Sequence, residues 1–287
     1  MIAMTHFMKT LLIALIVLFP AIANGTMTIR NYSAASHSRF YTGADKNFIG
    51  ALYDFSGVGY SSDGRWATLV SDNYFISAAH LHPATAQTVT FCTSNDPKGT
   101  KYTYTVAGGT KIGSTDLWIG WFDTTVNPSI ERYPILTLPE NNDYVGLELY
   151  NYGKQDIVGR NVVEFLCSSS CGGSTGFVAG YDYDNHDALS VGGDETYIIT
   201  GDSGAPSFTV FDSNLTLFGI HWSHTSSVAV EGAISYDTFV PKYFDEVNAV
   251  LASGGQSLEA VPEPGMIWYL MVIAGALVLQ RRRHALP

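Results

Sequence analysis

Three short segments carry residue types that together could perform acyl transfer. Residues 75–80 are an apolar run that ends in small alanines and His80, so an imidazole is expected at the end of a strand. Asp116 directly precedes another apolar run, and Ser203 lies within Gly-Asp-Ser-Gly at 201–204. A serine hydroxyl becomes a nucleophile when a neutral imidazole removes its proton, and a carboxylate can orient that imidazole. These residues are therefore the candidate nucleophile, base and orienting acid.

The same segments resemble the catalytic motifs of the trypsin/chymotrypsin family of serine peptidases. Ala-Ala-His at 78–80, Asp-Leu at 116–117 and Gly-Asp-Ser-Gly at 201–204 occur in that family's chain order. The resemblance covers roughly residues 40–251 and implies a serine endopeptidase built from two antiparallel β-barrels, with the cleft between them. An α/β-hydrolase is excluded, because in that class the serine of the Gly-x-Ser-x-Gly motif precedes the catalytic histidine along the chain, whereas here His80 precedes Ser203.

The resemblance also implies the role of each residue. His80 would be the general base, Asp116 would hold its ring in the correct tautomer, and Ser203 would attack the substrate carbonyl. The backbone N–H groups of Gly201 and Ser203 would form an oxyanion hole, in which one donor contributes about 3 to 4 kcal/mol. Asp123 also lies beside an apolar run, but it matches no motif and is the weaker alternative to Asp116.

Asp202 matches the acid that pairs with a newly cut N-terminal ammonium in activated members of this family. The usual Ile-Val-Gly-Gly start is absent from this sequence. Cleavage after Arg39, in front of Phe40, is one candidate activation step, and a mature chain that starts at Asn24 is the alternative.

Three residues are expected to contact the substrate: Tyr197, Thr200 and His221. Tyr197 takes the place of the pocket-floor aspartate of trypsin-type members, so a Lys or Arg preference is not expected. Gly-Ile-His-Trp at 219–222 resembles a segment of glutamyl endopeptidases, whose histidine contacts an acidic substrate residue, as a buried carboxylate requires. Ile198 stands where those enzymes have a hydroxyl residue, and a core histidine is the alternative at 221.

Short apolar and β-branched runs recur between Gly, Asn, Asp and Pro clusters, which predicts an all-β chain with two antiparallel barrels. From Phe239 to Leu251 the apolar residues recur at helical spacing, which predicts an amphipathic helix that closes the domain. The expected strands are 66–70, 74–77, 88–92, 102–106, 117–122, 146–152, 162–166, 177–180, 207–211 and 215–220.

The two ends of the chain read as targeting segments. Residues 1–23 have the short apolar run and small-x-small end of a secretory signal peptide, with a retained anchor as the alternative. Residues 262–287 combine Pro-Glu-Pro, an apolar run and three arginines. They resemble the PEP-CTERM sorting signal, which implies a Gram-negative envelope, transient anchoring in the inner membrane and an exosortase-like partner; an ordinary anchor is the alternative. The expected division is a signal peptide at 1–23, barrels at 24–135 and 136–252, a linker at 253–264 and a sorting segment at 265–287.

Charge argues against nucleic acid as a partner. The chain has 26 Asp and Glu against 15 Lys and Arg, and its net charge is −11. Such a surface repels phosphate backbones, and no basic stripe offsets it. The acid-rich segment 182–187, with Asp194 and Glu195, suggests calcium but lacks the ligand spacing and glycine of an EF-hand loop. A solvated loop is expected there, without metal or cofactor.

Cysteine spacing permits one small disulfide. Cys167 and Cys171 could close a tiny loop in an oxidising compartment, and Cys92 would then be left over.

The sequence therefore predicts an exported serine endopeptidase that acts on proteins or peptides. A catalytically idle surface-binding protein that uses the aromatic residues near 181–183 is one alternative. An esterase on the same scaffold is another.

Overall fold

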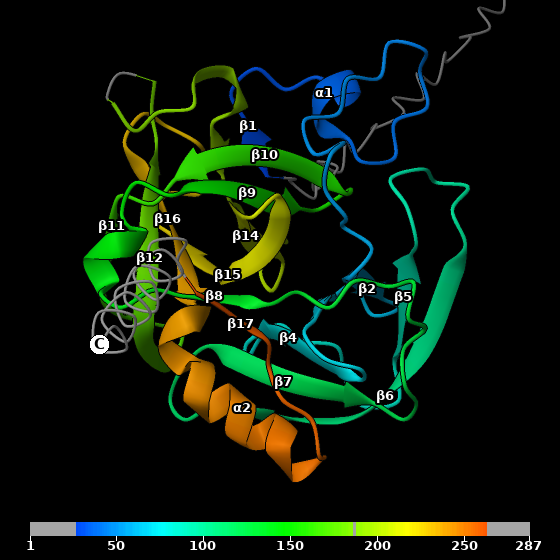
Figure 1. The fold of residues 1–287 in the computed structure, drawn as a ribbon. Coiled ribbons are helices and arrows are strands. Elements are labelled where there is room, and N and C mark those ends of the chain that lie inside the picture. Colours follow the sequence, from blue (N-terminus) through cyan, green and yellow to red (C-terminus); the bar gives the residue numbers. More distant parts are fainter. Residues whose placement is uncertain (1–26, 186–187, 263–287) are drawn as a thin grey trace, which may run out of the picture.

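The computed structural model describes residues 27–185 and 188–262. Over these residues the chain is mostly β, with two antiparallel barrel-like sheets and one short C-terminal helix (Figure 1). The fold class expected from the sequence is confirmed. A closed six-strand barrel followed by a curled second sheet is compatible with a chymotrypsin-like fold.

The first barrel closes in the strand order β2-β3-β4-β7-β6-β5. Its interior is filled by aromatic and branched side chains, among them Phe75, Phe91 and Phe122. Gly120 is required where it stands, because a Cβ atom there would lie 2.1 Å from the Phe75 ring. The strands are β2 (Val58–Ser61), β3 (Trp66–Leu69), β4 (Tyr74–Ala78), β5 (Thr88–Cys92), β6 (Lys101–Lys111) and β7 (Leu117–Phe122).

The second sheet runs in the order β10-β9-β14-β15-β16-β12-β11, with β8 paired to β15 outside this path. Its strands are β8 (Ile135–Thr137), β9 (Glu148–Gly153), β10 (Ile157–Val162), β11 (Phe165–Cys171), β12 (Ser174–Tyr183), β14 (Pro206–Phe211), β15 (Asn214–His224) and β16 (Ala233–Phe239). Two short 3-10 helices, η1 (Asn141–Tyr144) and η2 (Gly192–Asp194), lie in its connections.

One apolar core joins the two sheets. All side chains of strand β4 are buried. Because successive side chains of a strand point to opposite faces, both faces of β4 are covered. Phe75 points into the first barrel, whereas Ile76 and Ala78 belong to the core shared with Phe208 and Ile220 of the second sheet. The residues that follow β4 are thereby held at the junction of the two sheets.

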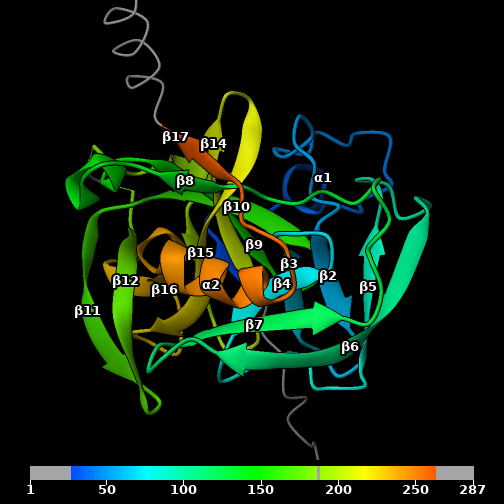
Figure 2. The same cartoon turned by 60° about the horizontal axis from the view of Figure 1, so that its bottom comes forward.

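The expected closing helix is present but begins later than the apolar pattern. Phe239 ends β16, a 3-10 turn η3 (Val240–Tyr243) follows, and α2 spans Phe244–Ser253. Val247 and Leu251 of α2 are buried in the shared core. Figure 2 brings this helix forward and shows it beside β4 and β7, strands from much earlier in the chain.

Both ends of the described chain are held by strand pairing, the first in a separate two-stranded sheet and the last beside β8 of the second sheet. Strand β1 (Thr28–Ile29) pairs with β13 (Thr196–Tyr197), and the short helix α1 (Ala34–His37) follows β1. At the other end, β17 (Ala260–Pro262) pairs in parallel with β8, so part of the expected linker 253–264 is ordered. The expected signal peptide and sorting segment lie outside the described residues.

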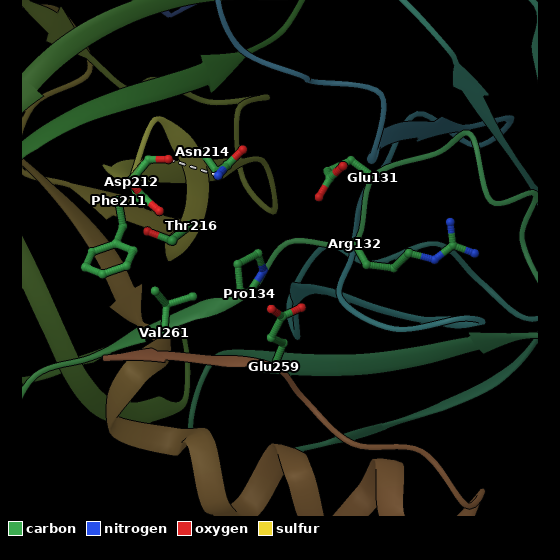
Figure 3. A pocket seen from close by; sticks show the side chains of 9 residues that line it. All are labelled: Glu131, Arg132, Pro134, Phe211, Asp212, Asn214, Thr216, Glu259 and Val261. Carbon is green, nitrogen blue, oxygen red and sulfur yellow. Dashed lines mark hydrogen bonds between the residues drawn. The ribbon is translucent and has the colours of Figure 1, made fainter. Parts of the chain in front are cut away.

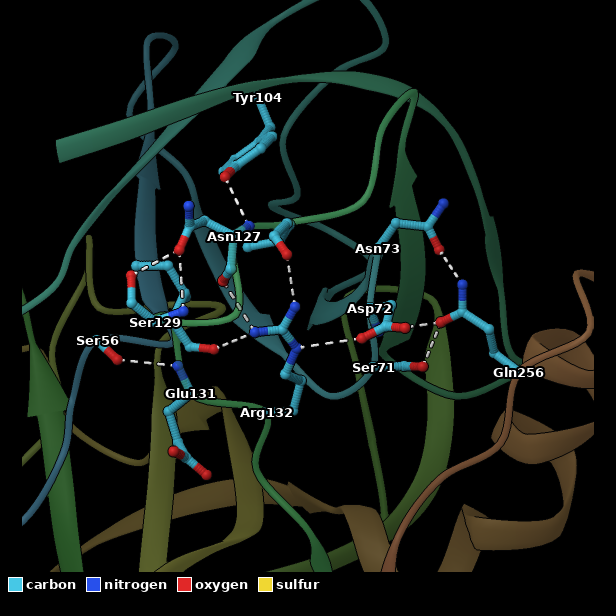
Figure 4. Close-up of polar contacts among 12 residues, drawn as sticks. Ser56, Ser71, Asp72, Asn73, Tyr104, Asn127, Ser129, Glu131, Arg132 and Gln256 are labelled. Carbon is cyan, nitrogen blue, oxygen red and sulfur yellow. Dashed lines mark hydrogen bonds and ion pairs between the residues drawn. The ribbon is translucent and has the colours of Figure 1, made fainter.

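Arg132 stabilises the connection between the two sheets through hydrogen bonds (Figure 4). Its guanidinium donates to the carbonyl oxygens of Val126 at 2.6 Å, of Asn127 at 3.0 Å and of Ile130, and it pairs with Asp72 at 3.4 Å. One cation thus satisfies three carbonyls of an irregular segment that has no ladder partner.

Within residues 27–185 and 188–262, no helix is both long enough and apolar enough to cross a membrane.

One expected strand is wrong, and a disulfide that the sequence left open is absent among the described residues. The expected strand 162–166 crosses the bend between β10 and β11, where Val163 exchanges backbone hydrogen bonds with the segment 146–147 at 2.8 and 3.0 Å. The considered disulfide does not form. Cys167 and Cys171 lie four residues apart on the extended strand β11, a span of about 13 Å, whereas a disulfide needs Cα atoms within about 7 Å.

Candidate active site

The pairing of β4 with β7 brings His80 and Asp116 together. Ala78, the last residue of β4, lies opposite Leu117, the first residue of β7. The residues just beyond each strand therefore meet, and the Ala79 N–H donates to the Asp116 carbonyl oxygen at 3.0 Å. Two residues separated by 36 positions along the chain become neighbours through strand register alone.

Asp116 holds the His80 ring by two hydrogen bonds. His80 Nδ1 donates to Asp116 Oδ2 at 2.6 Å, and the His80 backbone N–H donates to Oδ1 at 3.0 Å. The Asp116 side chain is only 1% exposed, whereas that of His80 is 37% exposed. Because a carboxylate accepts only, Nδ1 carries the proton and Nε2 is left as the acceptor. In the neutral ring, Nε2 can then act as a base.

The Gly-Asp-Ser-Gly loop rests on the segment that carries His80. Gly201 and Gly204 have φ angles of +108° and +87°, which L side chains rarely adopt. A Cβ atom at residue 204 would lie 2.9 Å from Ser77 Oγ and 3.0 Å from the Leu81 carbonyl oxygen. Ser203 and His80 therefore belong to two segments in direct contact.

Ser203 is partly exposed beside this contact. In the part of the chain that the structure describes, no hydrogen bond joins its hydroxyl to the His80 ring. Hydrogen bonds of this kind are often long without substrate and tighten when the substrate binds. The close approach of Gly204 to Ser77 and Leu81 places Ser203 and His80 at the same junction of the two segments.

Two backbone donors beside Ser203 have no acceptor. Among residues 27–185 and 188–262, the N–H groups of Gly201 and Ser203 make no hydrogen bond, whereas those of Asp202, Gly204 and Ala205 do. Unpaired N–H groups that lie close together in one loop can receive an anionic oxygen. These are the two donors expected from the sequence.

Asp202 is buried beneath the loop. Its carboxylate accepts the N–H groups of Lys154 and Ile199, each at 2.9 Å. Burial raises the pKa of Asp202, while these bonds, a backbone contact with Met27 and the charge of His221 act in the opposite direction. Asp202 therefore ties the serine loop to the β9 turn and to the N-terminal segment.

The environment of Arg39 does not favour chain cleavage at this residue. Arg39 is 1% exposed and its guanidinium donates to Asn95, Tyr152 and the Cys92 and Ser94 carbonyl oxygens at 3.0 to 3.2 Å. A protease would have to extract this side chain from the interior. From the early part of the described chain, Met27 lies beside Asp202.

Two of the three residues expected to contact substrate are fully buried. The Tyr197 hydroxyl donates to the Ser226 carbonyl oxygen and accepts the Ser226 N–H, both at 2.7 Å. His221 has no exposed surface, and both ring nitrogens are bonded to protein oxygens. Thr200 is exposed at the start of the serine loop. The structure therefore leaves Thr200 accessible and gives no support to a direct contact between His221 and an acidic substrate residue.

Sequence reasoning missed the partners of His221. They are Asp237 of β16 and the carbonyl oxygen of Tyr152 on β9. A backbone carbonyl has no sequence signature. Asp237 had one: with Ala233 and Ser235 it marks one face of a period-two strand pattern that the sequence analysis did not identify.

The acid-rich region does not assemble into a metal site among the described residues. Asp194 pairs with Arg160 at 2.7 Å. Glu195 is buried and accepts the Val191 N–H at 2.8 Å and the Ser190 hydroxyl at 3.1 Å. Burial, together with the charges of Asp184 and Asp182, raises the pKa of Glu195 to about 7, although the hydrogen bonds from Val191 and Ser190 act in the opposite direction.

Replacing Glu195 with glutamine should raise the unfolding free energy at pH 8 by about 1 to 3 kcal/mol. The pKa of Glu195 in the folded protein lies above the ordinary value of 4.5. The protonated carboxyl therefore contributes its full stability below pH 4.5, and this stability is lost as the pH rises through about 7. Urea unfolding from pH 4 to 8 measures the difference, with Glu246→Gln on exposed α2 as the control. Parallel curves for wild type and Glu195→Gln would contradict the prediction.

A pocket of about 330 Å³ lies apart from the candidate triad (Figure 3). The inter-sheet connection, the β14–β15 turn and β17 line it, with carboxylates from Glu131, Asp212 and Glu259. It contains no histidine that could act as a base. This pocket therefore holds no counterpart of the His80–Asp116 pair.

Comparison with models of known protein families and with curated proteins finds no match.

Proposed function

We propose that this chain is an exported serine endopeptidase of the trypsin/chymotrypsin type, with His80, Asp116 and Ser203 as its triad. One observation carries the proposal. Asp116 fixes the His80 ring at the end of β4, and the glycine that follows Ser203 rests on that same segment. A binding protein has no need of an oriented imidazole beside two unpaired amide groups.

The proposed reaction uses only groups already described. Ser203 Oγ attacks the substrate carbonyl carbon while His80 Nε2 takes its proton, and Asp116 stabilises the imidazolium that forms. The Gly201 and Ser203 N–H groups receive the oxyanion. His80 then protonates the leaving amine, and a water molecule, deprotonated by His80, hydrolyses the acyl-serine. Because the His221 donors are occupied, we propose no preference for acidic residues.

Digestion of a mixed peptide library by the exported protein tests this function, with Ser203→Ala as the control. The proposal expects cleavage of internal peptide bonds by the wild type and none by the variant. Turnover of esters without amides would favour the esterase alternative, and no turnover of either would favour an idle binding protein. Cleavage after Glu would show that a site for acidic residues exists after all.

A further inference from the structure

His221 lies at the centre of a buried polar cluster behind the serine loop. Nδ1 is 2.7 Å from Asp237 Oδ1, and Nε2 is 3.1 Å from the Tyr152 carbonyl oxygen. Asp237 also accepts the hydroxyl groups of Tyr181, at 3.1 Å, and Ser207. His221 and Asp237 have no exposed surface, so no water competes for these bonds.

The contacts define the charge of the ring. A carbonyl oxygen and a carboxylate oxygen can only accept, so both ring nitrogens must carry protons. The ring is therefore an imidazolium that forms a buried ion pair with Asp237. Loss of either proton would set a nitrogen lone pair against an oxygen and remove one of the two bonds.

The backbone of the same residue holds the serine loop. The Gly204 N–H donates to the His221 carbonyl oxygen, and the His221 N–H donates to the Ala205 carbonyl oxygen, both at 2.9 Å. A β-bulge directly after His221 breaks the regular pairing with β16. The His221 side chain also links this part of β15 to Tyr152 of β9 and to Asp237 of β16.

We propose that His221 is a positioning residue, whose imidazolium ion pair with Asp237 fixes the backbone of residues 203–205 and with it the geometry of the two unpaired N–H groups. The effect on turnover rests on the proposed peptidase function, whereas the ordering of the loop does not.

We expect the ion pair between His221 and Asp237 to depend on pH. Four groups face the ring: Asp237 from β16, Asp202 from the serine loop, the Tyr152 carbonyl from β9 and the Tyr181 hydroxyl from β12. Burial lowers the pKa of His221, but Asp237, Asp202 and the Tyr152 carbonyl raise it by more, so the net direction is upward. The contacts and the raised pKa both favour the charged ring, and the loop is expected to loosen when alkaline pH removes the proton.

Asp237→Asn tests the proposal, because it removes the charge and keeps the shape. We expect its kcat at pH 8 to fall about 10- to 100-fold, the size of effect that misplacement by about 1 Å produces, with KM within about twofold. The alkaline fall of kcat should move down by about one pH unit or more. Thr238→Val is the matched control, since Thr238 is the next residue of β16, is buried, and its hydroxyl has no partner among the described residues. An alkaline limb that stays in place in Asp237→Asn would overturn the proposal.

Two measurements decide the matter even if the wild type hydrolyses nothing. Nitrogen NMR of the full-length Ser203→Ala protein should show both His221 nitrogens protonated at pH 7. Hydrogen exchange of the Gly204 amide should be at least about tenfold faster in Asp237→Asn than in Thr238→Val. A neutral His221 ring, or equal exchange in the two variants, would refute the positioning role whatever the enzyme does. The NMR measurement remains decisive if Asp237→Asn does not fold.

Discussion

Replacing Asp116 with asparagine is expected to lower kcat about 10⁴-fold with little change in the fold. The carboxylate accepts two hydrogen bonds from His80, one from the ring and one from the backbone. An amide can accept only through its oxygen. If that oxygen keeps the backbone N–H, the NH₂ group faces Nδ1 and forces the proton onto Nε2. The ring then presents a donor to Ser203 and cannot take its proton.

The measurement is steady-state hydrolysis of a peptide found in the library digest. Asp123→Asn is the matched control, because Asp123 directly follows the same strand but is exposed, and among the described residues its side chain hydrogen-bonds only to neighbouring Thr124. We expect this control to keep wild-type kcat within about twofold. A kcat for Asp116→Asn within tenfold of wild type would show that Asp116 does not set the tautomer.

Gly204→Ala is expected to lower kcat/KM by about 100-fold or more, because the serine loop can no longer rest on the His80 segment. The added Cβ would lie 2.9 Å from Ser77 Oγ, 3.0 Å from the Leu81 carbonyl oxygen and 3.4 Å from the Ala78 nitrogen. Backbone atoms cannot rotate away, so the loop must move. The φ angle of +87° adds strain of about 1 to 3 kcal/mol in unfolding free energy.

Strain alone must be separated from the lost contact. Gly173→Ala provides that control, since Gly173 has a similar φ of +81° but no heavy atom within 4 Å of the added Cβ. We expect a comparable loss of stability in Gly173→Ala with unchanged kcat/KM. Equal activity in the two variants would mean that the contact between loop and strand is unimportant.

Much of the fold was accessible from the sequence because its strands are short, apolar and separated by clear turn residues. The expected runs 88–92 and 117–122 match β5 and β7 at both ends. Strand β2 was missed because its Val-Gly-Tyr-Ser sequence has little apolar signal. The helix start was misplaced because Phe239, although it fits the helical stripe, ends β16.

The residue types of the candidate site could be predicted from the sequence, but the contacts between these residues could not. His80, Asp116 and the serine loop stand out by motif, whereas the register that joins Ala78 to Leu117 depends on the whole barrel. His221 stands out by motif too, yet its surroundings come from Tyr152 and Asp237, 69 and 16 residues away. Burial decides whether a histidine meets substrate or holds the backbone, and a local sequence pattern does not report burial.

Labelling with a fluorophosphonate probe tests the central claim most directly, since this reagent bonds only to a serine whose proton a neighbouring base removes. Peptide mapping of the labelled wild-type protein should find one adduct, on Ser203. Labelling should vanish in Ser203→Ala and slow by about 100-fold or more in His80→Ala. Labelling of a folded His80→Ala protein at the wild-type rate, or no labelling of the folded wild type, would contradict the account.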